Sequence, residues 1–136
     1  MAAFTKPREI YTNIVLLIAR LGVSALMLTH GWPKLQKLMA GGEIKFADPM
    51  GIGATATLVL VVFAEVACSV LIGIGFKTRL ATIPLIATML TAGFVIHAAD
   101  PISQKEKSFL FLIIYLFLLL KGSGKISLDY LAFGRK

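Results

Sequence analysis

Apolar residues fill four long blocks of this chain, and polar residues gather in the segments between them. The blocks cover about residues 10–29, 54–74, 80–96 and 104–120. A helix needs about 20 mostly apolar residues to cross the hydrocarbon core of a bilayer. The first three blocks meet this requirement. The fourth is continuously apolar only from Phe109 and reaches a spanning length by extension backward through charged residues.

The apolar blocks are continuous rather than alternating, which favours helices over strands. Only helices and closed barrels satisfy every backbone polar group in hydrocarbon. The tight turn at residues 75–79 makes the second and third helices antiparallel neighbours. The sequence therefore predicts an all-α fold in which residues 1–136 form a single membrane domain, a transmembrane four-helix bundle.

Two shorter amphipathic segments are expected beside the bundle. In the long connection after the first block, residues 33–39 predict a short interfacial helix, with Trp32 at the level of the lipid headgroups. After the fourth block, the residues from Ser127 onward predict a short amphipathic tail that lies on the membrane surface.

Composition supports a lipid environment, and the distribution of charge indicates an orientation. The chain is 57% hydrophobic, its mean hydropathy is +0.85, and its formal net charge is +7. The basic residues flank the apolar blocks and form no continuous stripe, so we expect no nucleic-acid partner. With the N-terminus inside, eight Lys and Arg residues fall on the inner side and five on the outer side. We therefore expect both termini to be cytoplasmic.

Arg20 and Glu65 are charged residues in the middle of apolar blocks, where a charge is costly and usually faces a partner or a cavity. Counted along their helices, both fall roughly 15–17 Å into the membrane. At equal depth on antiparallel neighbours they are expected to pair. The pair is either a static ion pair that fixes the helix register or the polar centre of a site for a ligand or for protons.

His30 and His97 end two blocks that run in the same direction, so both should reach the outer face, with Asp100 three residues after His97. Three alternative roles follow for the two histidines. They cap helix ends, they relay protons or contact a ligand, or they bind haem or a metal. The last alternative lacks an evident third ligand, and no haem, metal or flavin site is predicted. Tyr115 is the polar group midway along the fourth block and needs a partner if it is buried.

Several short motifs, in their order and spacing, resemble the DoxX family of small four-helix membrane proteins over nearly the whole chain. The motifs are Ala19-Arg20, the run from His30 to Lys34 with Trp32, Glu65 followed by Leu71–Phe76, the turn Gly75–Arg79, His97, Glu106-Lys107, and Gly122-x-Gly124-x-x-Ser127-x-Asp129. The family takes its name from a subunit of a thiosulfate:quinone oxidoreductase.

The resemblance implies a membrane subunit linked to a quinone-dependent oxidoreductase, with a lipophilic ligand such as a quinone in the bundle. Arg20 and Glu65 would form the polar floor of its cavity, and His30 and His97 would stand at its outer mouth. Lys34 and Trp32, from the motif after the first block, are further candidates. A partner oxidoreductase subunit and a bacterial inner membrane are expected.

Whether the chain has an activity of its own is left open. The alternative is a membrane protein without catalysis, either a scaffold for a partner enzyme or a small-solute permease. No internal repeat is visible, so a permease would have to act as a homo-oligomer. Small residues such as Gly22, Ser24 and Ala25 could supply the contact face of a scaffold.

Overall fold

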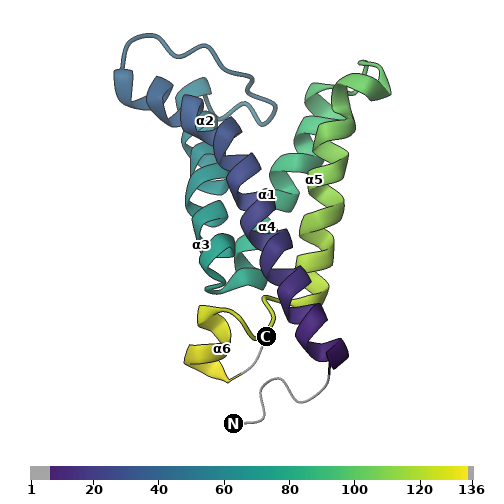
Figure 1. The fold of residues 1–136 in the computed structure, drawn as a ribbon. Helices are drawn as coiled ribbons and strands as arrows, with labels where there is room; N and C mark the ends of the chain where they lie inside the picture. Colours follow the sequence, from purple (N-terminus) through teal and green to yellow (C-terminus); the bar gives the residue numbers. More distant parts are fainter. Residues whose placement is uncertain (1–6, 135–136) are drawn as a thin grey trace.

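A computed structural model describes residues 7–134 and confirms an all-helical bundle (Figure 1). No strand occurs in this part of the chain. In chain order the elements are α1 (Pro7–Ala40), α2 (Ala54–Val62), η1 (Phe63–Cys68), α3 (Ser69–Ile74), α4 (Thr78–Thr91), η2 (Ala92–Ile96), α5 (Ile102–Lys121) and α6 (Leu128–Phe133).

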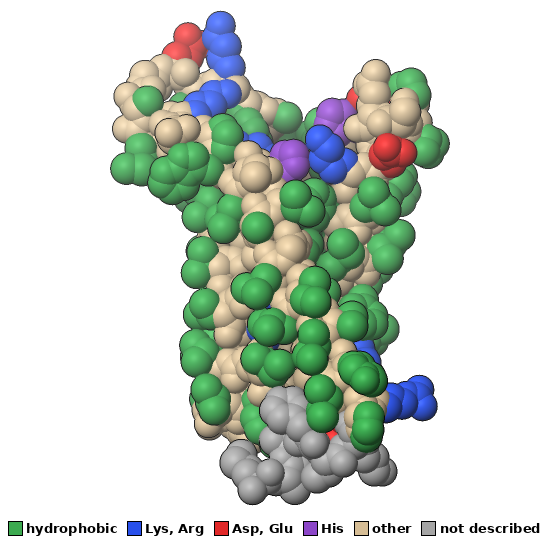
Figure 2. All heavy atoms as spheres, in the orientation of Figure 1, with side chains coloured by type: hydrophobic (Ala, Val, Ile, Leu, Met, Phe, Trp, Pro, Cys, Tyr) green, Lys and Arg blue, Asp and Glu red, His purple; other side chains and the backbone are tan. Residues whose placement is uncertain are grey.

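Within residues 7–134, three helical segments are long and apolar enough to cross a membrane, namely Pro7–Ala40, Ala54–Ile74 and Thr78–Ile96. The 20-residue helix α5 packs along α4 as the fourth member of the bundle. Large apolar side chains cover the outside of the bundle (Figure 2), as with Leu80 at 62% and Leu120 at 78% exposed. In water such a surface would be unfavourable, whereas in lipid it is the expected exterior. The protein is an integral membrane protein.

Helix α1 is longer than the sequence predicted. The expected interfacial helix at residues 33–39 is not a separate element, because α1 continues through Pro33 to Ala40. Proline is tolerated inside membrane helices, where neighbouring groups compensate for the lost backbone hydrogen bond. With 34 residues, α1 is about 51 Å long at 1.5 Å per residue and extends beyond the hydrocarbon core.

The second and third spans each contain one π-helical turn. In the second span, η1 interrupts the α-helix between α2 and α3 and carries Glu65. In the third span, η2 follows α4 and ends beside His97. Such turns add a residue to the helix and re-aim the side chains around it, and they are frequent at functional sites. The end of the bundle that contains the loop 41–53 and the α4–α5 connection is here called the loop end (Figure 1); η2 lies at this end, and η1 lies midway along the second span.

The core consists of apolar side chains from all four long segments, and two glycines set the helix spacing above it. The buried cluster comprises Leu16, Val23, Met27, Ala64, Cys68, Ile72, Ala81, Leu85, Met89, Phe111, Tyr115 and Leu118. A Cβ at Gly31 would lie 2.9 Å from the Cβ of Glu65, and one at Gly93 would lie 2.6 Å from Cε1 of Phe109. The contact at Gly31 requires glycine, because real Cβ atoms do not approach another Cβ so closely, whereas a Cβ at Gly93 would force the Phe109 ring to shift.

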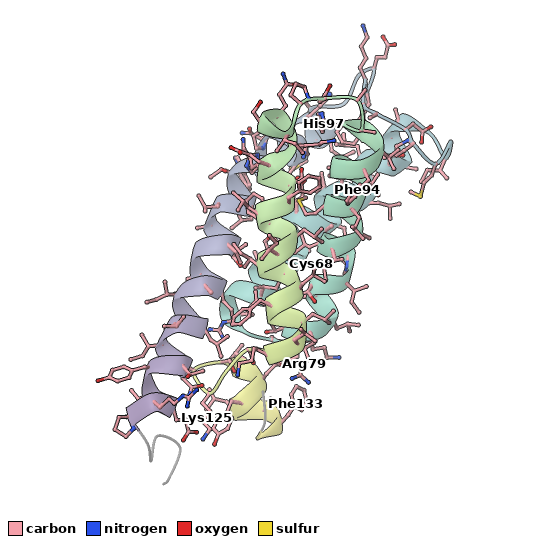
Figure 3. The ribbon with its side chains drawn as sticks, turned by 90° about the vertical axis from the view of Figure 1, so that its right-hand side faces the viewer. Cys68, Arg79, Phe94, His97, Lys125 and Phe133 are labelled. Atoms are coloured by element: carbon pink, nitrogen blue, oxygen red, sulfur yellow. The ribbon has the colours of Figure 1, made fainter. Side chains whose placement is uncertain are left out.

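The opposite end of the bundle, here called the tail end, is closed by the chain that follows α5. The α3–α4 turn includes Gly75, with φ 74°, and Lys77, with φ 48°, both in the left-handed region. Helix α6 lies against this turn, and the ring of its Phe133 stacks on that of Phe76 at 6.2 Å. Figure 3 shows His97 at the loop end and Lys125, Arg79 and Phe133 at the tail end.

Candidate functional site

The predicted pairing of Arg20 with Glu65 is wrong. Both residues are buried, at 1% and 3% exposed, but their side chains hydrogen-bond different partners. Arg20 donates to the carbonyl oxygens of Ser123 and Ile126 at 2.9 and 2.8 Å. Glu65 accepts from Nζ of Lys34, which lies 2.8 Å from each of its carboxylate oxygens. The two charges therefore belong to separate centres.

The register of the first two spans explains the difference. Gly31 lies against Glu65, Ser24 against Gly73, and the Arg20 guanidinium against Gly75. Arg20 is thus level with the turn that ends the second span, ten positions beyond Glu65. At 1.5 Å per residue this places the two charges roughly 15 Å apart along the bundle. Counting depth from the start of each apolar block missed this offset, because α1 starts earlier and ends later than its block.

Arg20 organises the tail end. Its guanidinium holds two carbonyls of the tail, and Asp129 completes the attachment. The Asp129 carboxylate accepts from the backbone N–H groups of Lys77 at 2.6 Å and Thr78 at 3.0 Å, where α4 begins. A carboxylate at the first turn of a helix satisfies free N–H groups and complements the helix dipole. Asp129, from the C-terminal motif that begins at Gly122, therefore caps α4 from a distant part of the chain. This role is structural.

The centre at the loop end is the ion pair of Lys34 and Glu65. The Glu65 side chain is 4% exposed and the Lys34 side chain 30%. The close approach of Gly31 to η1 places Lys34, one turn further along α1, over the carboxylate. The pair is thus shielded on one side and open on the other, which leaves the ammonium accessible to a ligand.

A polar cleft of about 240 Å³ opens beside this pair, between α1, α5 and the end of α4. Figure 2 shows histidine and lysine side chains in the hollow at the loop end. The polar residues that line the cleft are His30, Lys34, Glu65, His97, Gln104, Lys107 and Ser108. Its floor is apolar and consists of Met27, Met89 and Phe111, all buried. The His30 ring stands edge-on to the Phe111 ring at 5.8 Å.

His97 and Asp100 form a hydrogen-bonded pair at the rim of the cleft. Nδ1 of His97 lies 2.7 Å from a carboxylate oxygen of Asp100, and the side chains are 43% and 38% exposed. A histidine held by a carboxylate has its second ring nitrogen, Nε2, directed elsewhere. This arrangement is suited to proton exchange between bulk water and the cleft.

A larger apolar groove meets the cleft at four shared residues, which are Lys34, Glu65, Ala92 and His97. The groove has a volume of about 590 Å³ and lies between the loop 41–53, the second span and α4. Most of its lining is apolar, including Phe46 and Met50 from the loop and Ala64 and Ala87 from the helices. A chain-like apolar group in this groove would therefore have its end beside a buried carboxylate and an ammonium group.

The loop over the groove is held by two sets of contacts. Lys37 donates to the carbonyl of Lys45 at 2.6 Å, and its Nζ lies 5.8 Å from the centre of the Phe46 ring. Asp48 accepts from the backbone N–H groups of Gly53 and Ile52 at the start of α2. These hydrogen bonds, that from Gly53 foremost, hold the pKa of Asp48 below its usual value. The loop is thus a defined wall of the groove.

The structure brings together some of the predicted site residues and separates others. His30, Lys34, Glu65 and His97 line one cleft, with Asp100 paired to His97 at its rim. Arg20 lies at the far end and does not form the predicted cavity floor. Trp32 is 55% exposed and lies outside both cavities.

Tyr115 is fully buried one turn below the cleft, and its ring stacks on that of Phe111 at 6.1 Å. Sequence reasoning missed the contribution of α5, which supplies Gln104, Lys107 and Ser108 to one wall. The signal was their spacing with Phe111, which places all four on one helix face.

Among the described residues, no group of three or more His, Cys, Asp or Glu side chains is placed to hold a metal ion. Comparison with known families found a match. The model of the family described as DoxX matches residues 15–98, which is more than half of the chain and includes Arg20, Glu65 and His97. No curated protein and no solved structure matched the chain.

Proposed function

The chain belongs to the DoxX family, and we propose that it binds a quinone at the junction of cleft and groove and serves a quinone-dependent oxidoreductase as its membrane subunit. The observation that carries the proposal is the meeting of an apolar groove with a buried ion pair. A quinone combines an apolar chain with a ring whose two carbonyls accept hydrogen bonds.

The groove and the ion pair match the two parts of such a ligand. The groove lies within the usual size range of ligand pockets, roughly 300–1,000 Å³, and offers an apolar lining to the chain. At its polar end, the partly exposed Lys34 ammonium can donate to a ring carbonyl. Glu65 keeps the ammonium in place and provides an acceptor for the hydroxyl of the reduced ring.

Reduction of a quinone to a hydroquinone consumes two electrons and two protons. In this proposal the electrons come from the partner oxidoreductase, a role that rests on the family resemblance. The protons come from water through the His97–Asp100 pair, which stands at the rim of the cleft. His30, Lys34 and Glu65 line the remaining distance from the rim to the groove.

Filling the groove tests the proposal. Ala87 lines the groove and is exposed, so Ala87→Phe should occupy the groove without disturbing the core. Ala25 is an exposed residue of α1 outside both cavities, and Ala25→Phe is the matched control. Lipids are extracted from the protein purified in mild detergent, and a short-chain quinone is then titrated into the wild type and both variants by calorimetry.

We expect quinone in the wild-type extract and saturable binding of the added quinone. Ala87→Phe should weaken this binding at least tenfold, whereas Ala25→Phe should leave it unchanged. A wild-type protein that neither carries nor binds quinone would contradict the proposal. Equal binding by the two variants would place the quinone elsewhere.

A further inference from the structure

The polar cleft has features that the proposed quinone site does not use. Its α5 wall presents Gln104, Lys107 and Ser108, which lie away from the groove. They share one face of α5 with Phe111, which lies one turn further along at the floor of the cleft. This wall and floor define a second binding surface on the opposite side of the Lys34–Glu65 pair.

The charge in the cleft is unbalanced. The Lys34 ammonium is paired with Glu65, and His97 is paired with Asp100. Lys107 lines the cleft and has no ion-pair or hydrogen-bond partner among the described residues. Its neighbours Gln104 and Ser108 add neutral hydrogen-bond donors. A cation surrounded by free donors, at a site lined by two lysines and one carboxylate, favours an anionic ligand.

The floor of the cleft indicates which kind of group the anionic ligand carries. Met27, Met89 and Phe111 are 1%, 5% and 8% exposed, and they form an apolar base beneath the donors. Methionine sulfur and an aromatic face pack favourably against a flat ring. An inorganic anion would leave the small exposed part of this base in contact with water, whereas an aromatic body would cover it. The volume of about 240 Å³ limits the ligand to a small molecule.

We infer that the cleft binds a small aromatic carboxylate from the aqueous phase. Its ring lies on the floor of Met27, Met89 and Phe111, and its carboxylate accepts hydrogen bonds from Lys107 and the donors of α5. This site and the proposed quinone site lie on opposite sides of the Lys34–Glu65 pair, which lines both cavities together with Ala92 and His97. A ligand in the cleft and a chain in the groove could therefore be bound at the same time.

Benzoate is the probe for this inference, and the full-length protein in detergent is titrated by calorimetry. Benzamide serves as the neutral analogue of similar shape, and sulfate as an inorganic anion. Lys107→Gln removes the unpaired cation from an exposed position, so the variant should fold. Lys105→Gln is the matched control, because Lys105 lies two residues away on the same helix and outside the cleft lining, where it bonds the Ala98 carbonyl.

We expect saturable benzoate binding that Lys107→Gln weakens about tenfold, the effect of losing one hydrogen bond between charged groups. Lys105→Gln and the groove variant Ala87→Phe should bind benzoate like the wild type. Benzamide and sulfate should each bind at least tenfold more weakly than benzoate. Equal effects of the two lysine variants would overturn the inference. Benzamide binding as tightly as benzoate would also overturn it, because the anionic charge would then not be recognised. Sulfate binding as tightly as benzoate would overturn it as well, because the aromatic ring would then not be recognised.

Discussion

Lys34 and Glu65 depend on each other because the Glu65 carboxylate is almost completely removed from solvent. Its side chain is 4% exposed, and Lys34 contacts both of its oxygens. Losing one member of such a pair leaves a buried charge without compensation, which is more costly than losing both. Solvent in the cleft reduces this cost, because the Lys34 side chain is 30% exposed.

Replacing Lys34 should therefore destabilise the protein more than replacing a lysine in the loop. We expect Lys34→Met to lower the free energy of unfolding by about 2–4 kcal/mol, whereas Lys45→Met should change it by less than about 0.5 kcal/mol. Adding Glu65→Leu to Lys34→Met should recover much of the loss. Denaturant unfolding in detergent micelles measures all of these variants. A Lys34→Met variant as stable as Lys45→Met would show that the pair does not form.

Arg20 and Glu65 should behave as independent residues. Arg20 bonds the tail near Asp129, roughly 15 Å from Glu65 along the bundle. Arg20→Leu should cost about 2–4 kcal/mol, because the buried carbonyl of Ser123 and the partly buried carbonyl of Ile126 lose a charged donor. In a double-mutant cycle the coupling with Glu65→Leu should stay below about 0.5 kcal/mol, whereas the coupling with Asp129→Asn should exceed it. Strong coupling between Arg20→Leu and Glu65→Leu would show that the two residues form a direct pair after all.

At the scale of elements, the site depends on how closely α1 approaches the second span. The contact is made at Gly31, against the π-helical turn η1, and it lies one turn before Lys34. The π-helical turn adds a residue in the middle of the span and thus turns Glu65 toward α1. Neither element alone would bring the two charges together.

A pair of glycine variants tests this dependence. Gly31→Ala places a methyl group 2.9 Å from side-chain atoms of Glu65 and Val66, so α1 and η1 must separate. Gly22 lies on the same helix with no atom within 4 Å of an added Cβ, so Gly22→Ala is the control. We expect Gly31→Ala to cost about 1–3 kcal/mol and to weaken binding of the short-chain quinone, and Gly22→Ala to do neither. If the two variants have the same stability, the close contact is not required.

At the scale of the molecule, the two ends of the bundle have different roles. The tail end is closed by hydrogen bonds between Arg20, Asp129 and backbone groups, whereas the loop end holds the cleft and the groove. The excess of basic residues predicts that the tail end faces the cytoplasm. The cleft would then open to the outer side of the membrane.

Cysteine labelling in intact cells tests this orientation. The single native cysteine, Cys68, is 2% exposed and should contribute little background. A cysteine at Lys45, in the loop, should react with a membrane-impermeant thiol reagent added outside. One at Lys121, at the end of α5, should react only after the membrane is permeabilised. The reverse pattern would place the cleft on the cytoplasmic side.

The sequence predicted the elements better than their relations. Block lengths predicted the helical spans, and the turn at Gly75 predicted the antiparallel neighbours. The His30, Lys34 and His97 candidates do share one cleft with Glu65. The partners of Arg20 and Glu65 depend on the register between helices, which an apolar block does not encode. In the structure, the register between α1 and the second span is set by the continuation of α1 past Pro33 and by the contact at Gly31.

The central claim is that a lipophilic ligand ends at the Lys34–Glu65 pair with its chain in the groove. A quinone carrying a photoreactive group on its chain, activated on the purified protein and mapped by peptide mass spectrometry, tests it most directly. The account predicts labelling of the groove wall, in the loop near Phe46 and Met50 and in α4 near Ala87. The labelling should be lost in Ala87→Phe and retained in Ala25→Phe. Labelling spread over the lipid-facing surface, unchanged in Ala87→Phe, would contradict the claim.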